Sequence, residues 1–164
     1  SLGLEARTTV GEINANRYWA TTGWQAGDNA MDEHALGGVD IEIGMPLPYM
    51  NWATFYAKAF KWNTETSGVK DSVGNILSFR AEVPVIPGFA IEAGQTQYSS
   101  DETTNNFVKL EYDLIQAFKK EKAPLFTNYA YKMASMQDQR LKKVRRENRI
   151  YKQMKNSTVT VKGF

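Results

Sequence analysis

The residue types that most often carry chemistry are sparse in this chain of 164 residues. It has no cysteine, which excludes disulfides and thiolate metal sites. Its single histidine, His34, follows Asp32 in a predicted long loop, and this carboxylate–imidazole pair is the one arrangement similar to a hydrolytic site. The pair Gly37-Gly38 leads into a predicted strand instead of a helix, so it does not form a phosphate loop. We therefore expect His34 to be a surface loop residue. For the chain we expect no enzyme activity, no catalytic residue, no cofactor and no metal.

Charge divides the chain into two segments of opposite sign. Residues 119–164 hold 13 Lys and Arg against 3 Asp and Glu, a net charge of +10, whereas residues 1–118 hold 7 against 15, a net charge of −8. A basic tail fits a nucleic acid, an anionic membrane surface or the acidic remainder of its own molecule. No glycine or proline lies between Pro124 and Gly163, so the tail is also compatible with a basic amphipathic helix or with a plainly solvated charged face.

Seven stretches of the first 118 residues alternate between apolar and polar positions, as β-strands with one apolar face do. The apolar positions, run by run, are Leu2, Leu4, Ala6; Ile13, Ala15, Trp19; Val39, Ile41, Ile43, Met45; Ala53, Phe55, Ala57, Ala59; Leu77, Phe79, Ala81, Val83; Phe89, Ile91, Ala93; and Val108, Leu110, Tyr112, Leu114. The prediction is an all-β, up-and-down antiparallel structure.

The polar faces of these runs carry charges of both signs at mid-strand. These residues are Asp40, Glu42, Lys58, Arg80, Glu82, Glu92, Lys109, Glu111 and Asp113. A soluble sheet with a solvated outer face explains them, and so does the polar interior of a transmembrane β-barrel. We expect them to line a lumen.

The connections between the strands favour the membrane barrel. Short links at 8–9, 46–51 and 85–88 alternate with long polar ones at 21–37, 63–75 and 99–106, which is the pattern of an outer-membrane barrel with short periplasmic turns. Aromatic residues gather near the strand ends, as membrane interfaces favour. They are Trp19, Trp24, Trp62 and Tyr98 toward the long loops, and Tyr49, Trp52 and Phe118 toward the short turns.

Seven strands leave two unpaired edges, which lipid does not tolerate. We therefore expect this chain to be part of a larger barrel, completed by upstream strands or by another chain. No export signal opens the sequence, so the chain is either cytosolic or a mature product or fragment that begins inside a strand. We expect the fragment.

Several stretches, taken in order, resemble the intimin/invasin-type inverse autotransporters, specifically their outer-membrane β-barrel translocator domain. They are Ile13-Asn-Ala-Asn-Arg-Tyr-Trp19, Thr22-Gly-Trp24, Gly38-Val-Asp-Ile-Glu42, Leu47-Pro-Tyr49, Trp52-Ala53, and a tail pattern of Arg140, Val144, Arg146, Asn148 and Ile150.

The resemblance implies a barrel of about twelve strands that exports its own C-terminal adhesive domain. Residues 1–118 would be barrel strands and residues 119–164 a lumen-occupying segment, with a short helix from Ser135 to about Lys143 and an extended linker from Val144 to Met154. The linker residues are Arg140, Val144, Arg145, Arg146, Asn148 and Ile150. Implied partners are outer-membrane lipid and lipopolysaccharide, the outer-membrane assembly machinery, and a passenger domain or a chain that completes the barrel. The alternative is a soluble antiparallel β module whose tail binds nucleic acid or another anionic partner.

Overall fold

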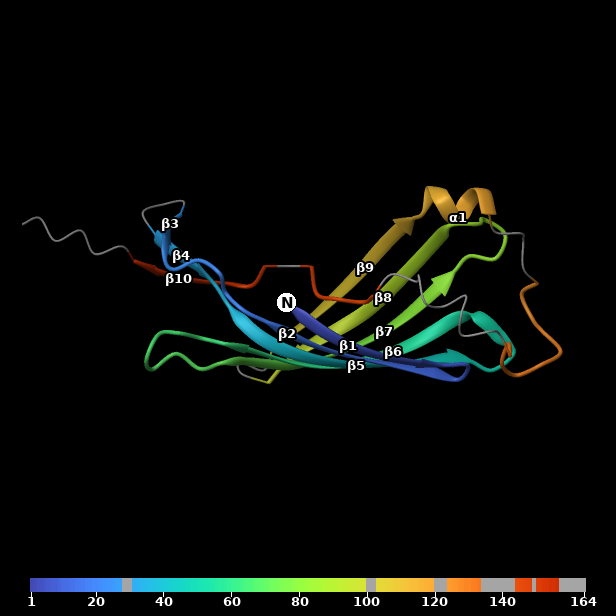
Figure 1. The fold of residues 1–164 in the computed structure, drawn as a ribbon, viewed down its shortest axis with the longest axis horizontal. Coiled ribbons are helices and arrows are strands. Elements are labelled where there is room, and N and C mark those ends of the chain that lie inside the picture. The colour runs from blue at the N-terminus through green and yellow to red at the C-terminus, as the bar shows by residue number, and fades with distance from the viewer. Residues whose placement is uncertain (28–30, 100–102, 120–123, 134–143, 149, 157–164) are drawn as a thin grey trace, which may run out of the picture.

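A computed structural model describes residues 1–27, 31–99, 103–119, 124–133, 144–148 and 150–156. Seven antiparallel strands form one curved sheet in sequence order, and the tail runs across its open side (Figure 1). The strands are β1 (Leu2–Thr8), β2 (Gly11–Tyr18), β5 (Gly37–Leu47), β6 (Met50–Asn63), β7 (Ser72–Glu82), β8 (Phe89–Tyr98) and β9 (Thr104–Tyr112). The predicted all-β, seven-stranded antiparallel architecture is confirmed; among the described residues the sheet does not close, because β1 and β9 are its edges.

The two faces of this large sheet show the reverse of the exposure usual in soluble proteins. On the inner face Asp40, Glu42 and Glu92 are only 3 to 5% exposed, whereas Val108 and Leu110 on the outer face are 71% and 66% exposed. Charged residues in soluble proteins are almost never fully buried unless paired. The outer face is therefore an apolar band, and the inner face is the polar interior of the fold.

Four aromatic rings on the inner face each lie over the glycine directly opposite on the neighbouring strand. The cross-strand pairs are Trp62 with Gly38, Tyr56 with Gly44, Phe60 with Gly74, and Phe107 with Gly94. A Cβ built on any of these glycines would come under 3.0 Å from the partner's ring. The missing side chains let the rings lie against the backbone, an arrangement that fixes register and helps a sheet to curve.

The last strand ends earlier than expected. Leu114 and Phe118 were predicted to extend it, but residues Leu114–Lys119 form the helix α1. Asp113 joins the two elements, because its N–H still donates across to Gly88 O (2.8 Å) while its carbonyl accepts from Ala117 N (2.9 Å), which opens the helix. The four-residue spacing of Leu114 and Phe118 suits one face of a helix as well as a strand. Among the described residues no helix is long and apolar enough to cross a membrane.

A second, small sheet lies at the long-loop end of the large one, and the sequence did not reveal it. It consists of β3 (Gln25–Ala26), β4 (Met31–Ala35) and β10 (Lys152–Asn156), in the order β10-β4-β3. Two of its strands fall in the stretch predicted as a long polar loop. Figure 1 shows β10, in red, beside β4 at one end of the molecule.

At the opposite end, a stretch of the tail holds the short β5–β6 turn. Tyr49, at a positive φ of 63°, donates its N–H to Ala130 O (2.9 Å) and accepts from Thr127 N (3.0 Å). The Trp52 indole donates to Leu125 O at 2.8 Å. The tail therefore contacts both ends of the large sheet.

Candidate functional site

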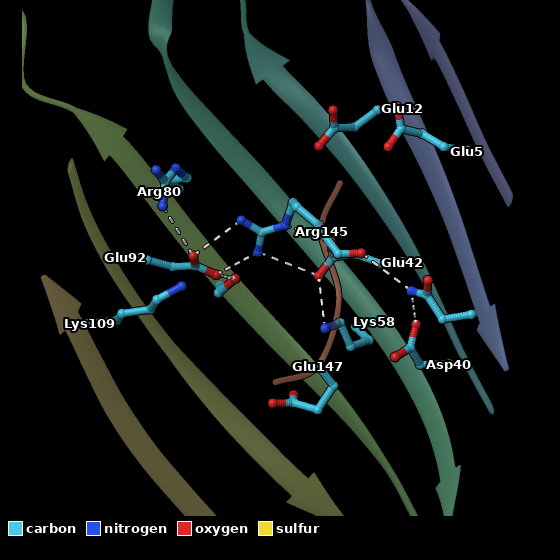
Figure 2. Close-up of polar contacts among 12 residues, drawn as sticks. Glu5, Glu12, Asp40, Glu42, Lys58, Arg80, Glu92, Lys109, Arg145 and Glu147 are labelled. Atoms are coloured by element: carbon cyan, nitrogen blue, oxygen red, sulfur yellow. Dashed lines mark hydrogen bonds and ion pairs between the residues drawn. The ribbon is translucent and has the colours of Figure 1, made fainter. Parts of the chain in front are cut away.

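Arg145 lies on the inner face between two carboxylates that come from different strands. Its Nε donates to Glu42 Oε1 at 2.7 Å and its Nη2 to Glu92 Oε1 at 2.8 Å. The guanidinium carbon also sits 3.8 Å from the centroid of the Tyr56 ring, within the range of a cation–π contact. We call Glu42, Tyr56 and Glu92, from β5, β6 and β8, the Arg145 site. Figure 2 shows Arg145 between Glu42 and Glu92.

Both carboxylates of the Arg145 site are held in place by further inner-face residues. Lys58 Nζ lies 3.3 Å from Glu42 Oε2. Ser78 Oγ donates to Glu92 Oε1 at 2.9 Å, and Arg80 Nη1 lies 3.7 Å from Glu92 Oε2. Buried carboxylates are tolerated when they are paired and hydrogen-bonded, so the site is positioned by the sheet as well as by Arg145.

Hydrogen bonds to the tail's main chain fix it on either side of the Arg145 side chain. Asn16 Nδ2 donates to Arg145 O at 3.4 Å, and the Tyr18 hydroxyl accepts from Glu147 N at 2.9 Å. Asp40 orients both residues, because it accepts from Asn16 Nδ2 (2.9 Å) and from the Tyr18 hydroxyl (2.8 Å). Residues 144–148 contain neither helix nor strand, and these hydrogen bonds hold their main chain against the inner face.

Beyond the Arg145 site, aromatic stacking and pairing with the small sheet hold the tail. The Tyr151 ring stacks on Trp62 with centroids 4.5 Å apart, and Lys152 Nζ pairs with Glu33 Oε2 at 2.6 Å. Lys155 Nζ lies 4.1 Å from the centroid of the Trp24 ring. The tail thus has three successive sets of contacts, at the short turns, at the Arg145 site and at the small sheet.

The remaining charged residues expected on the inner face form a second group beside the Arg145 site. Arg80 Nη1 pairs with Glu111 Oε2 at 2.6 Å, and Lys109 Nζ lies 3.9 Å from the same oxygen. Glu82, half-buried at the end of β7, shares the face of Arg80 two residues away. Asp113 departs from the prediction, because it follows the last residue of β9 and does not lie on a strand.

The predicted linker residues divide into two groups. Val144 and Arg145 are half-buried, whereas Arg146, Asn148 and Ile150 are exposed. Exposure alternates from Arg145 to Asn148, and Val144 departs from that alternation. Arg140 and the helix predicted from Ser135 to about Lys143 lie outside the described residues.

Two expectations about the long-loop end were wrong. His34 is not a surface loop residue: it lies in β4 and is 4% exposed, with its ring 5.3 Å from that of Trp24 and its Nε2 3.4 Å from Glu65 Oε2. Trp62, assigned to a membrane-interface belt, is 3% exposed and packs under Tyr151 on the inner face. Both rings are covered by chain segments distant in sequence, which local alternation does not report.

Sequence reasoning also missed the uncharged partners of the site. Tyr56, Asn16 and Tyr18 bind the tail, and the only signal for them was their place on the same strand face as the charges. Within the described part of the chain, no group of three His, Cys, Asp or Glu residues is arranged to hold a metal ion.

Comparison with known proteins relates the chain to one described family. The family model described as "Inverse autotransporter, beta-domain" matches residues 1–148, which include Arg145 and every residue of the Arg145 site and stop short of β10. No curated protein and no solved structure matches the chain.

Proposed function

Because this chain belongs to the inverse autotransporter β-domain family, whose members are translocator domains of the Gram-negative outer membrane, we propose that its inner face lines a lumen occupied by its own C-terminal segment. The family acts as a translocator and anchor for a passenger domain and is not typically enzymatic. The proposal assigns Arg145 as the residue that retains the linker in the lumen.

The observation that carries this proposal is the pairing of Arg145 with Glu42 and Glu92. Removing one partner of a buried ion pair costs about 3–5 kcal/mol, because the other charge is left uncompensated. The Arg145 side chain is 22% exposed, so solvent screening makes the cost smaller here. The contact still favours this position of the linker over one in which an uncharged residue faces the site.

The path of the tail supports threading from the periplasmic to the extracellular side. Residues 125–132 contact the short β5–β6 turn, Arg145 contacts Glu42 and Glu92 within β5 and β8, and β10 pairs at the long-loop end. Short turns are periplasmic in bacterial barrels. A chain that leaves the last strand in the periplasm would cross the lumen in this order and emerge at the cell surface.

The outer face and the two edge strands are the surfaces that would meet the partners of this chain in the outer membrane. Exposed apolar residues of the outer face, such as Ile41, Phe79 and Leu110, would contact lipid and lipopolysaccharide, and the edge strands β1 and β9 would pair with the rest of the barrel during assembly by the outer-membrane machinery. The soluble alternative is set aside, because the family is an outer-membrane family and the apolar face is the exposed one.

Charge reversal at two neighbouring arginines tests the proposal. Arg145→Glu should make the tail of the protein in outer-membrane vesicles about tenfold more sensitive to proteinase K, since a loss of roughly 1.4 kcal/mol raises the released fraction tenfold. Arg146→Glu is the matched control, because Arg146 is exposed and its reversal should leave sensitivity unchanged. Heat-modifiable gel mobility should stay the same in both variants. Equal sensitivity of the two variants and the parent would rule out retention by Arg145.

A charge swap adds a second readout. In Arg145→Glu combined with Glu92→Arg, the opposite charges face each other again, and we expect part of the protease protection to return. Glu92→Arg alone should be as sensitive as Arg145→Glu, because it places two cations together.

A further inference from the structure

The small sheet offers a site that the lumen proposal does not use. We propose that the β3–β4 hairpin is a strand-addition site at the extracellular end of the barrel, which captures the exported chain by main-chain pairing as it leaves the lumen and holds it in one register. This inference rests on the proposed threading. Its ligand class is an extended polypeptide, here residues 152–156 of the same chain.

The pairing between β4 and β10 is continuous over five residues. Lys152 to Asn156 run antiparallel to Met31 to Ala35, with Met154 opposite Glu33. Leu36 N also donates to Tyr151 O at 2.8 Å, which extends the pairing toward the lumen. Because such pairing uses backbone groups, affinity comes from the main chain and side chains add selectivity.

One face of β10 packs on residues of two long connections. Gln153 Oε1 accepts from Glu65 N at 3.2 Å, and Lys155 lies over Trp24. His34, directly opposite Gln153, fills the space between Trp24 and Glu65. These contacts cover the hairpin's inner face, which explains the burial of the chain's single histidine in a stretch with the composition of a loop.

The small sheet and the Arg145 site bind the same part of the tail, one through residues 152–156 and the other through Arg145, and so fix the same register. A slip of the tail by one residue would turn Arg145 away from Glu42 and Glu92, and would also exchange the two faces of β10. The two sites therefore oppose sliding together, although each binds through different chemistry: ion pairing in one, main-chain hydrogen bonds in the other.

A cysteine cross-link tests the pairing directly, because the natural chain contains no cysteine. Leu36 and Tyr151 form a hydrogen-bonded pair, so Glu33 and Met154, three positions away, form a non-hydrogen-bonded pair with closely spaced side chains. In outer membranes, Glu33→Cys with Met154→Cys should form a disulfide, seen as a gel shift reversed by reductant. The matched control, Glu33→Cys with Gln153→Cys, places the two thiols on opposite faces of the sheet. Its disulfide yield should be at least tenfold lower. Equal yields, or no disulfide in either, would overturn the proposal.

Two variants in the Glu33→Cys, Met154→Cys background separate main-chain capture from side-chain recognition. Replacing Lys152, Gln153, Lys155 and Asn156 by threonine keeps the backbone donors and should retain most of the cross-link. Gln153→Pro removes a backbone donor from within β10 and should reduce the yield severalfold. Loss of the cross-link in the threonine variant, or its persistence in the proline variant, would refute capture through the main chain.

Failure of this inference is distinguishable from failure of the proposed function. If the hairpin does not capture the chain, the cysteine pair stays unlinked while the proteinase K contrast between Arg145→Glu and Arg146→Glu persists. If threading itself is wrong, that contrast disappears whatever the cysteines do.

Discussion

Arg145 and Glu92 meet through two parallel hydrogen bonds, from Nη2 to Oε1 at 2.8 Å and from Nη1 to Oε2 at 3.3 Å. A planar guanidinium fits this arrangement, whereas an ammonium group acts as a single point charge. With Glu42 bound to Nε, the Arg145 site recognises the shape of the group as well as its charge.

This geometry predicts that lysine replaces Arg145 poorly. Arg145→Lys should give tail protection between those of the parent and Arg145→Ala, because an ammonium cannot bind both carboxylates with the same parallel bonds. The rate of proteinase K cleavage in outer-membrane vesicles measures the protection of the tail. Full protection in the lysine variant would show that charge alone suffices.

Chemical rescue is expected at the same position. In Arg145→Ala, millimolar methylguanidinium should occupy the vacated Arg145 site. It should thereby slow the release of the tail from the inner face and restore part of the protection against protease. Tetramethylammonium at equal ionic strength is the control, since it cannot donate hydrogen bonds to Glu42 and Glu92. Identical effects of the two cations would contradict a guanidinium-shaped site.

The Tyr18 hydroxyl joins the sheet to the tail, and its removal should loosen the tail without unfolding the sheet. Tyr18→Phe deletes the acceptor for Glu147 N and the donor to Asp40 while keeping the ring that packs on Trp62. Loss of hydrogen bonds of this kind costs about 0.5–1.5 kcal/mol each. Hydrogen exchange of the Glu147 amide should accelerate, and unchanged exchange would exclude the bond.

The pairing of rings with glycines predicts a sharp difference between two glycine substitutions. A Cβ at Gly94 would lie 2.6 Å from Leu77 O and 2.8 Å from Phe107 Cζ, whereas a Cβ at Gly23 meets nothing within 4 Å. Gly94→Ala should therefore destabilise the barrel by about 1–3 kcal/mol, and Gly23→Ala should not. Urea denaturation in detergent, followed by tryptophan fluorescence, compares them. Equal unfolding midpoints for the two variants would mean that the Phe107 ring can be accommodated without a glycine at position 94.

Asp71, in the connection between β6 and β7, should titrate below its ordinary range. A hydrogen bond from Lys61 Nζ (2.9 Å) and another from Thr64 N (3.0 Å) lower the pKa of this carboxyl from its ordinary value of 3.8. A lowered folded-state pKa contributes stability that is present above pH 3.8 and is lost as the pH falls through the folded value. The connection should thus loosen only in strong acid.

Carboxyl NMR titration of the detergent-solubilised protein measures the Asp71 midpoint. Lys61→Met should move it upward, since the first cause of the shift is removed, and Lys70→Met serves as a nearby control. A parent midpoint at or above 3.8 would argue against the Lys61 contact.

The sequence by itself determined the two faces of the strands and the opposite charges of the two segments. Ile41 and Ile43 alternate with Asp40 and Glu42, and this period of two assigns faces without any knowledge of the tertiary structure, because neighbouring side chains on a strand point to opposite sides. The family resemblance, confirmed by the match over residues 1–148, followed from motifs that are equally local.

Only the tertiary structure decided which residues of the tail meet which residues of the sheet. Arg145 and Arg146 are neighbours of the same residue type, yet Arg145 binds Glu42 and Glu92 whereas Arg146 is exposed. Pairing of β10 with β4 places Met154 opposite Glu33, and the side chain of Lys152 binds Glu33 across 119 residues of sequence. Such contacts depend on the path and register of the whole intervening chain, and a local pattern of polarity carries no information about either.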